Sequence, residues 1–249
     1  NYDLYLKKVI RKIDCFQCIS KNIFYDLKKI GIKENKIINI SNSIKINKFK
    51  KIKRKIRLKK TIKLITVGRY AKYKKGFDLL PIFAKKLIDK KINFKWKIIG
   101  ENSKLLYKNK FIRSNSNLFE IIENIKNIDE DFFPHSTLIN HYKSSDIYLN
   151  LSRIESFGIT FIEALASKVP IISFAGKGAN EIVKDKINGF LIKDNDVSEF
   201  INKILQIKEN KEMLNNMQNN CLRSIKKFDL DTCSNKLINI YENEIKQKN

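Results

Sequence analysis

Two carboxylates, Glu155 and Glu163, stand eight positions apart, and their type and spacing could do chemistry. An apolar run, 146–152, leads through a polar elbow, 153–158, into an apolar helix-like segment, 159–167. We expect Glu163 in the first turn of that helix, where a carboxylate can accept two hydrogen bonds from a vicinal diol such as a ribose. Glu155 lies on the elbow, within reach of a polar ligand group. The two acids are interpreted as two contacts to one ligand; the alternatives are an acid that complements the helix dipole and a solvated loop acid.

The start of the same helix offers a second kind of contact. Phe157, Gly158, Ile159 and Thr160 lead from the elbow into the helix. The first N–H groups of a helix have no partner inside it, and together with the helix dipole they form an anion site. The sequence therefore predicts that backbone N–H groups at this point face a negatively charged ligand group.

A basic loop, 68–76, is the third candidate (GRYAKYKKG). Gly68 and Arg69 follow a predicted strand directly, and Lys75 lies near the end of the loop. A guanidinium and an ammonium opposite a helix start suit a diphosphate, because each charge-assisted hydrogen bond contributes ~1.5–3 kcal/mol. The alternative is a solvated basic loop, which explains the other lysines of the loop better than it explains Arg69.

Strand-like and helix-like segments alternate along most of the chain and must position these residues. The alternation predicts an α/β fold with a doubly wound, Rossmann-like parallel sheet, whose ligand crevice lies at the carboxyl ends of the strands. The expected strands are 14–20, 36–40, 62–67, 94–99, 146–152 and 169–174, with a last one at the end of 181–192; the expected helices are 21–30, 77–90, 136–143, 159–167, 196–207 and 230–245, with a short one at the start of 181–192, a helix or loop near 104–111 and an apolar segment at 118–128.

Four parts are expected along the chain. Residues 1–49 are predicted to be the tail end of a preceding Rossmann-like domain, because they hold too few elements for a core of their own. The basic segment 50–60 is interpreted as a linker, with a membrane-surface segment as the alternative. A ligand-binding Rossmann-like domain is expected at 61–227, followed by a C-terminal helix at 228–249. The chain begins at Asn1 rather than Met, so a piece of a longer protein is expected.

Composition and charge limit the classes of protein to which this chain can belong. An apolar fraction of 43% supports a packed core. No apolar run reaches the ~18 residues that span a bilayer, and four cysteines do not suggest a disulfide framework, so a cytoplasmic location is expected. The net charge of +25 comes from Lys with only seven Arg, and no zinc-finger, helix-turn-helix or RNP-type pattern is present, so nucleic acid is not expected as a partner. A biased, solvated surface is the favoured explanation; peripheral attraction to an anionic membrane or to phosphorylated ligands is the alternative.

Residues that commonly hold metals or act as nucleophiles are few. Cys15 and Cys18 have CxxC spacing without a second pair, and His135 and His141 match no metal-binding motif. The sequence contains no P-loop, no GxSxG and no GxGxxG. The prediction is therefore no metal site and no cofactor.

With these residues identified, the stretch 14–241 resembles the donor-binding half of a GT-B-fold retaining glycosyltransferase of the family 4 type. The most specific element is the E-x7-E motif, here Glu155-SFGITFI-Glu163, and the loop GRYAKYKKG is similar to the family's phosphate-binding "GR….KG". Two further matches are GKGANEIVKDKINGFLI, which places Glu181 on a family Glu, and 41–44, which looks like the "NGI" that ends the family's N-terminal domain.

The resemblance implies a nucleotide-sugar donor bound without a required metal. Glu163 would hold the ribose hydroxyls, Arg69 and Lys75 the diphosphate, and Glu155 the donor sugar, while backbone N–H groups of 158–160 would contact phosphate or sugar. Transfer would retain the anomeric configuration, with the two cations and the helix dipole stabilising the departing nucleoside diphosphate. The implied acceptor is a glycan, a glycolipid or another lipid-linked acceptor, or a cell-surface polysaccharide, with the enzyme cytoplasmic or peripheral at the inner membrane face.

The chain also departs from the family pattern. The turn at 42–45 lacks the family's Gly, 100–102 reads Gly-Glu-Asn where the family has "GdG", and 118–134 does not match the usual strand-and-glycine pattern. Most of the N-terminal domain, which carries the family's acceptor site, is missing, so this fragment alone is expected to be inactive. The first alternative is a non-catalytic nucleotide-sugar binding module; the second is a basic nucleic-acid protein, which predicts a steep salt dependence of binding.

Overall fold

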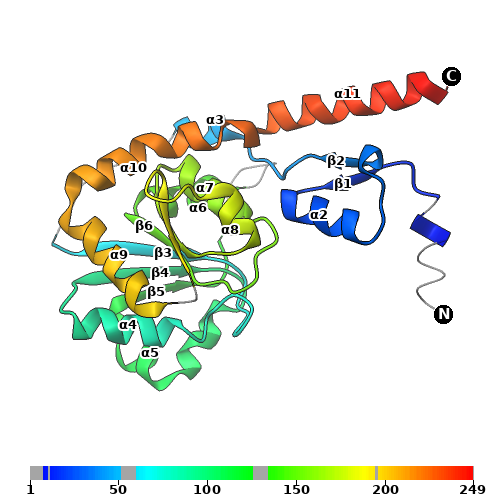
Figure 1. Cartoon of the computed structure of the whole chain (residues 1–249). Coiled ribbons are helices and arrows are strands. Elements are labelled where there is room, and N and C mark those ends of the chain that lie inside the picture. The colour runs from blue at the N-terminus through cyan, green and yellow to red at the C-terminus, as the bar shows by residue number, and fades with distance from the viewer. Residues whose placement is uncertain (1–7, 11, 52–59, 126–133, 194–195, 249) are drawn as a thin grey trace.

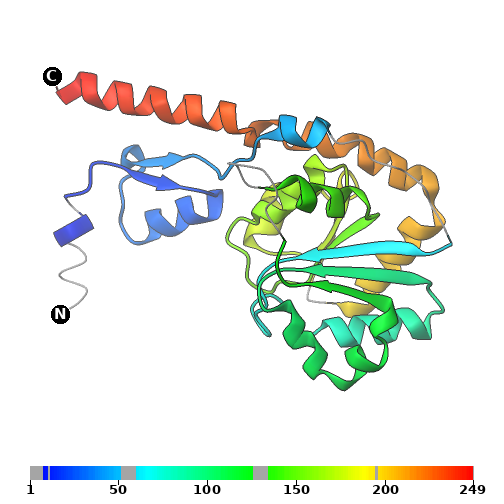
Figure 2. The same cartoon turned by 180° about the vertical axis from the view of Figure 1, so that it is seen from behind.

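The structure is a computed structural model and describes residues 8–10, 12–51, 60–125, 134–193 and 196–248. A large α/β domain carries a six-stranded sheet, and a small N-terminal unit lies beside it, as Figures 1 and 2 show from opposite sides. No helix within these ranges is both long enough and apolar enough to cross a bilayer.

The strands of the large sheet are all parallel and lie in the order β5-β4-β3-β6-β7-β8. The chain builds outward from β3 to β5, then returns to add β6, β7 and β8 on the other side. Because the order reverses between β3 and β6, the loops after these two strands diverge and open a crevice at their carboxyl ends. The predicted doubly wound parallel sheet is confirmed. Its strands are β3 (Ile62–Val67), β4 (Phe94–Ile99), β5 (Phe119–Ile122), β6 (Ile147–Asn150), β7 (Ile171–Phe174) and β8 (Gly189–Ile192).

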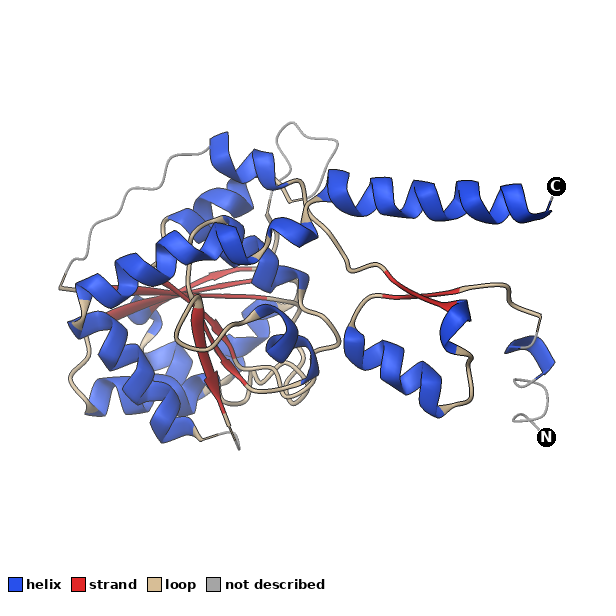
Figure 3. Ribbon diagram, turned by 45° about the horizontal axis from the view of Figure 1, so that its top comes forward, coloured by secondary structure: helices blue, strands red, loops and turns tan. Residues whose placement is uncertain are grey.

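Helices cover both faces of this sheet (Figure 3). On one face Phe83 and Phe200, from two different helices, pack edge to face with ring centroids 4.9 Å apart. On the other face Tyr142 and Phe161 lie in a second apolar cluster. The first face carries α4 (Leu80–Asp89) and α9 (Val197–Glu209), the second carries α3 (Ile46–Lys51), α6 (Ser136–Lys143), α7 (Ile159–Ala166) and α8 (Lys177–Ile182), and α10 (Lys211–Ser224) contributes to both clusters.

The sequence of each strand reflects this double coverage. Strands β6 and β7 are buried along their whole length, which requires the nearly continuous apolar runs that the sequence provides. Strand β4 alternates instead: Phe94, Trp96 and Ile98 enter the first cluster, while Lys95 points to the less covered face near the amino end of the sheet. The Trp96 Nε1–H donates to Thr66 Oγ1 at 3.1 Å, which satisfies the one polar group of the indole.

The N-terminal unit pairs β1 (Phe16–Cys18) with β2 (Ile37–Asn39) in parallel, and α2 (Lys21–Lys29) connects them. Its apolar cluster is separate from those of the large domain and small, as expected for too few elements. Polar contacts join α2 to α8, including an ion pair between Lys177 Nζ and Asp26 Oδ2 at 2.7 Å. The long α11 (Leu230–Lys248) runs beside this unit (Figures 1 and 2).

Several boundaries differ from the predictions. Part of the expected linker belongs to α3, because Phe49 is fully buried in the second cluster; residues 52–59 lie outside the described residues. The helix expected at 77–90 begins only at Leu80, after a series of turns. The helix expected within 181–192 begins at Lys177, and the apolar segment 118–128 contains β5 as an edge strand, with 126–128 outside the described residues. Helix α10 was not predicted. The region near 104–111 holds the 3₁₀ helix η2 (Ser103–Lys108) and α5 (Lys110–Ser114).

Candidate functional site

The loop after β3 and the elbow after β6 meet at the switch point of the sheet. Gly76 ends the basic loop with φ +69°, and a Cβ there would lie 2.0 Å from the carbonyl oxygen of Leu151, so only glycine allows this approach. The backbone N–H of Arg153 donates to the Lys74 carbonyl at 3.1 Å. The two candidate loops are therefore in direct backbone contact, as the topology predicts.

One arginine braces the two loops together. The guanidinium of Arg153 donates to both carboxylate oxygens of Asp78, at 2.8 and 2.9 Å, and lies 4.4 Å from the ring centroid of Tyr73. The hydrogen bonds with Asp78 raise the pKa of Arg153, so its guanidinium remains positively charged. Sequence reasoning missed this pair, although the rarity of Arg in a lysine-rich chain is a signal that could have found it.

The structure brings two predicted site residues together as an ion pair. Lys75 Nζ lies 2.6 Å from Glu155 Oε2, and both side chains are partly exposed. Arg69, at the start of the same loop, is exposed, and its guanidinium makes no hydrogen bond or ion pair with any residue in the described ranges. Gly68 closes β3, donating its N–H to the Ile99 carbonyl at 2.9 Å. Of the two predicted site cations on this loop, Arg69 is therefore uncommitted and Lys75 is held by a carboxylate.

The start of α7 lies between these groups. Gly158 precedes the helix with φ +90°, and a Cβ there would lie 2.5 Å from Phe161 Cδ2, so the left-handed turn needs glycine. Among the described residues the N–H groups of Gly158, Ile159 and Thr160 make no backbone hydrogen bond. The side chain of Phe157 packs instead on Phe228, with ring centroids 5.5 Å apart, so only its backbone is left for a ligand.

Glu163 lies deeper than the sequence predicts. Because α7 begins at Ile159, Glu163 falls in the second turn and not in the first, and its side chain is fully buried rather than at the crevice rim. The Tyr142 hydroxyl donates to Glu163 Oε2 at 2.8 Å, whereas Glu163 Oε1 is buried with no hydrogen-bond partner among the described residues. Burial raises the pKa of Glu163 to about 7, and the hydrogen bond from Tyr142 opposes that rise.

A second buried tyrosine supports the helix start. The Tyr148 hydroxyl donates to Thr160 Oγ1 at 2.9 Å, and the rings of Tyr142 and Tyr148 lie 6.0 Å apart. Burial raises the pKa of both tyrosines, so both hydroxyls remain protonated donors. Sequence reasoning missed both residues; the signal was a tyrosine in each of two buried segments, since a buried hydroxyl needs a partner.

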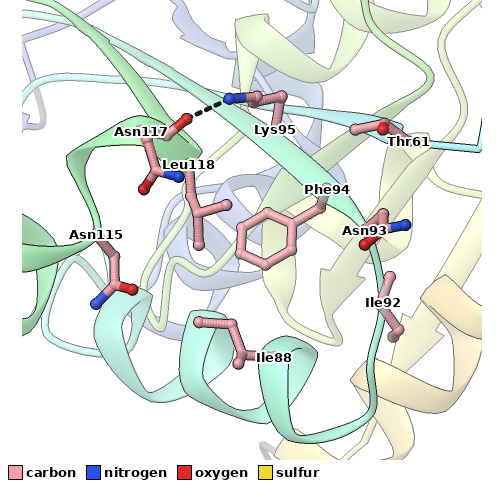
Figure 4. Close-up of a pocket in the computed structure, with 9 residues that line it drawn as sticks. All are labelled: Thr61, Ile88, Ile92, Asn93, Phe94, Lys95, Asn115, Asn117 and Leu118. Carbon is pink, nitrogen blue, oxygen red and sulfur yellow. Dashed lines mark hydrogen bonds between the residues drawn. The ribbon is translucent and has the colours of Figure 1, made fainter.

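Other features of the surface lie away from the crevice. A hollow of about 430 Å³ opens at the amino ends of β3 and β4, opposite the candidate loops; Phe94 and Leu118 line it, and Lys95 donates to the Asn117 carbonyl at its edge (Figure 4). In the part of the chain that the structure describes, no group of three or more His, Cys, Asp or Glu side chains gathers where it could hold a metal ion.

Comparison with known proteins points to one family. The family model described as glycosyl transferases group 1 matches residues 48–223. An uncharacterized glycosyltransferase of Methanocaldococcus jannaschii is 30% identical over 68% of this chain and 44% of its own length. The alpha-monoglucosyldiacylglycerol synthase of Acholeplasma laidlawii is 27% identical over 74% of this chain and 44% of its own.

Solved structures share the fold at lower identity. A glycosyltransferase from Rickettsia africae superposes with a TM-score of 0.78 at 22% identity, covering 98% of this chain and 67% of its own. Anabaena HepE in complex with UDP-glucose gives a TM-score of 0.74 at 16% identity, covering 92% of this chain and 64% of its own. The chain spans about half the length of the curated relatives that it matches. On the family match, which covers most of its residues, this chain belongs to the glycosyl transferases group 1 family.

Proposed function

We propose that this domain binds a nucleotide-diphospho-sugar in the crevice between the β3 loop and α7, and forms the donor half of a retaining glycosyltransferase of the GT-B family 4 type. The observation that carries the proposal is the meeting of Lys75, Glu155 and the free helix start at the switch point of the sheet, above a buried Glu163 with one unpaired oxygen. Each of these groups suits a different part of one ligand.

The diphosphate would lie between the basic loop and the start of α7. The exposed Arg69 guanidinium supplies an uncommitted charge, and the N–H groups of 158–160 supply donors aligned with the helix dipole. Lys75 would turn from Glu155 to a phosphate oxygen when the ligand enters, because the two acceptors carry the same sign of charge. Stabilising the charge of the departing nucleoside diphosphate is then the catalytic contribution of Arg69 and Lys75.

The nucleoside and the sugar would each contact one acid. Glu163 Oε1 is the spare acceptor for the ribose hydroxyls, and since the carboxylate is fully buried, the side chains above it must move aside when the ligand binds. Glu155, freed from Lys75, would hold hydroxyls of the donor sugar. Transfer would proceed with retention and without a required metal or cofactor.

The relatives suggest what the complete protein acts on. Anabaena HepE was solved with UDP-glucose, and the Acholeplasma laidlawii relative is named a synthase of a glucosylated diacylglycerol. A glycan, glycolipid or lipid-linked acceptor, and a cytoplasmic position that is peripheral at an anionic inner membrane face, are proposed on this basis. The non-catalytic binding module remains the alternative; it predicts donor binding without sugar transfer by the complete gene product.

Calorimetry of the chain with UDP, GDP, ADP and their sugars tests the proposal. One nucleoside diphosphate should bind, and Glu163→Ala should weaken it by ~10- to 100-fold, the loss expected for hydrogen bonds to a charged group. Addition of Mg²⁺ or a chelator should leave the affinity unchanged. Absence of binding by all three nucleotides, or an unchanged affinity in Glu163→Ala, contradicts the proposed site. Binding of DNA that weakens steeply with salt would favour the nucleic-acid alternative.

A further inference from the structure

Tyr142 and Glu163 form an isolated polar pair inside the second apolar cluster. Tyr142 comes from α6 and Glu163 from α7, and neither side chain is exposed to solvent. The 2.8 Å hydrogen bond from the tyrosine hydroxyl occupies Oε2 and leaves Oε1 without a partner among the described residues. Leaving a buried polar atom unpaired costs about 1–3 kcal/mol, so a ligand donor that reached Oε1 would recover that free energy.

We propose that Tyr142 is a positioning residue for Glu163: it holds one carboxylate oxygen, directs the other toward the bound nucleotide, and sets the pH above which the nucleotide binds. The inference rests on the proposed function, in which hydroxyl groups of the ribose donate to Glu163. Hydroxyl donors favour the ionised carboxylate, so the nucleotide binds the deprotonated form of Glu163.

The protonation state of Glu163 depends on two opposing influences. Burial disfavours the carboxylate and raises its pKa to about 7, while the Tyr142 hydrogen bond stabilises the carboxylate and lowers that pKa. The pKa of Tyr142 is itself far above its ordinary value because of burial, so its hydroxyl remains a donor throughout the range in which Glu163 titrates. Removal of the Tyr142 hydroxyl should therefore raise the pKa of Glu163 further, because the effect of burial is no longer opposed.

The other groups around Glu163 do not take over this role. Tyr148 on β6 is coupled to Glu163 only through space, since its hydroxyl donates to Thr160. Five titratable side chains on the elements packed against α7 have other partners: His141 interacts with Lys97 and Glu120, Lys143 donates to the Phe49 carbonyl, Glu181 accepts from the Lys21 N–H, Lys177 pairs with Asp26, and Cys221 donates to the Met217 carbonyl. The charged side chains of α3 and α10 that face solvent are Lys50, Lys51, Lys211, Glu212 and Arg223.

Tyr142→Phe removes the hydroxyl and keeps the ring. Calorimetry with UDP, or with whichever of GDP and ADP binds instead, is carried out from pH 5.5 to 9 at constant salt. Wild-type affinity should rise with pH and level off above about 7. In Tyr142→Phe the midpoint, which is the pH at half of the rise in nucleotide affinity, should move upward by about one pH unit or more. A hydrogen bond to a charged group corresponds to a pKa shift of that size. The terminal phosphate of the nucleotide itself titrates at about pH 6, so Glu163→Gln should keep only that component of the pH dependence.

Tyr148→Phe is the matched control, since it deletes the hydroxyl of a neighbouring buried tyrosine that does not contact Glu163. The nucleotide affinity of this variant can differ from that of wild type, but the pH midpoint of the rise in affinity should stay at the wild-type value. If Tyr142→Phe fails to fold, 3,5-difluorotyrosine at position 142 provides a stronger donor of nearly the same size, and the midpoint should then move downward.

The outcomes separate the two proposals. If the wild-type chain binds none of the three nucleotides at any pH, the proposed function fails. If it binds and Glu163→Gln keeps only the phosphate component of the pH dependence, but Tyr142→Phe keeps the wild-type midpoint, the proposed function stands and the role of Tyr142 is wrong. An equal shift in Tyr148→Phe would show general loosening of the cluster and would also overturn the inference.

Discussion

The two sides of the crevice differ in how they hold their charged groups. On the α7 side Glu163 is fully buried and hydrogen-bonded to Tyr142, whereas on the loop side Arg69 is exposed and Lys75 is partly exposed. Burial fixes geometry and makes the charge depend on pH. Exposure leaves a charged group screened by salt.

The two sides also owe their rigidity to different interactions. The α7 side is held by apolar packing of neighbouring helices around Glu163. The loop is held against the elbow by backbone hydrogen bonds to the Lys74 carbonyl and by one bidentate pair, Arg153 with Asp78. Mutations on the first side should therefore change folding stability and its pH dependence, and those on the second should mainly change ligand affinity.

The largest expected effect is on the buried side. Because the folded-state pKa of Glu163 is raised from 4.5 to about 7, the stabilisation from its bound proton is complete below pH 4.5 and is lost as the pH rises to about 7. The loss corresponds to about 3 kcal/mol of the free energy of unfolding. Glu163→Gln should remove this pH dependence. The difference in the free energy of unfolding between wild type and variant, measured in urea, should therefore change by about 3 kcal/mol between pH 4.5 and 8. Glu155→Gln is the control; a constant difference between wild type and Glu163→Gln would contradict the buried, ionising carboxylate.

The next effect is on the exposed side. In the proposed site only the diphosphate contacts the guanidinium, so Arg69→Ala should reduce the affinity for UDP, or for whichever of GDP and ADP binds instead, by ~10- to 100-fold and leave that for the nucleoside nearly unchanged. The loss should shrink as salt is raised from 0.05 to 0.5 M. Lys72→Ala, on the same exposed loop, is the control for general charge. Equal losses for UDP and uridine would remove Arg69 from the diphosphate site.

Local pattern was enough to predict the elements of the fold. Strands β3 and β4 fall at the predicted residues because each is a short segment rich in apolar, aromatic and β-branched side chains that ends directly before a Gly. Helix α10 was missed because the stretch Asn215–Asn220 is rich in Asn, which favours helix interiors poorly; packing of Leu214, Met217 and Cys221 in the core stabilises it instead. Tertiary packing of this kind leaves little trace in local pattern.

Part of the candidate site could also be proposed from local pattern in the sequence. Arg69, Lys75, Glu155 and Glu163 could be named because they lie on motifs that are local in sequence. Their supports could not be, since Tyr142 lies 21 residues from Glu163 and Asp78 lies 75 residues from Arg153. The depth of Glu163 was also mispredicted: the helix begins at Ile159 as expected, but the packing of the second cluster around it buries the carboxylate.

A smaller effect is expected when the brace between the two sides is weakened. Arg153→Lys keeps the charge but loses the bidentate geometry and the stacking on Tyr73, which should lower the free energy of unfolding by about 1–2 kcal/mol. UDP affinity should also fall, since Lys74 and Lys75 are positioned by the same contact. Arg113→Lys, at an exposed position of α5, should change neither quantity. Wild-type thermal stability and affinity in Arg153→Lys would show that the loop is held by other contacts.

The smallest effect on stability is expected at the ion pair that spans the crevice. Glu155→Gln removes the partner of Lys75, but since both side chains are partly exposed, the free energy of unfolding should change by less than about 1 kcal/mol. The affinities for the two ligands should respond differently. UDP should bind as tightly as to wild type or a few-fold more tightly, because Lys75 is released from Glu155. The UDP-sugar that binds should bind more weakly, because the proposed contact between Glu155 and its hydroxyls is lost. Calorimetry with the two ligands measures both. Parallel losses for UDP and the UDP-sugar would mean that Glu155 supports the loop rather than the sugar, and the division of labour between the two acids would then be wrong.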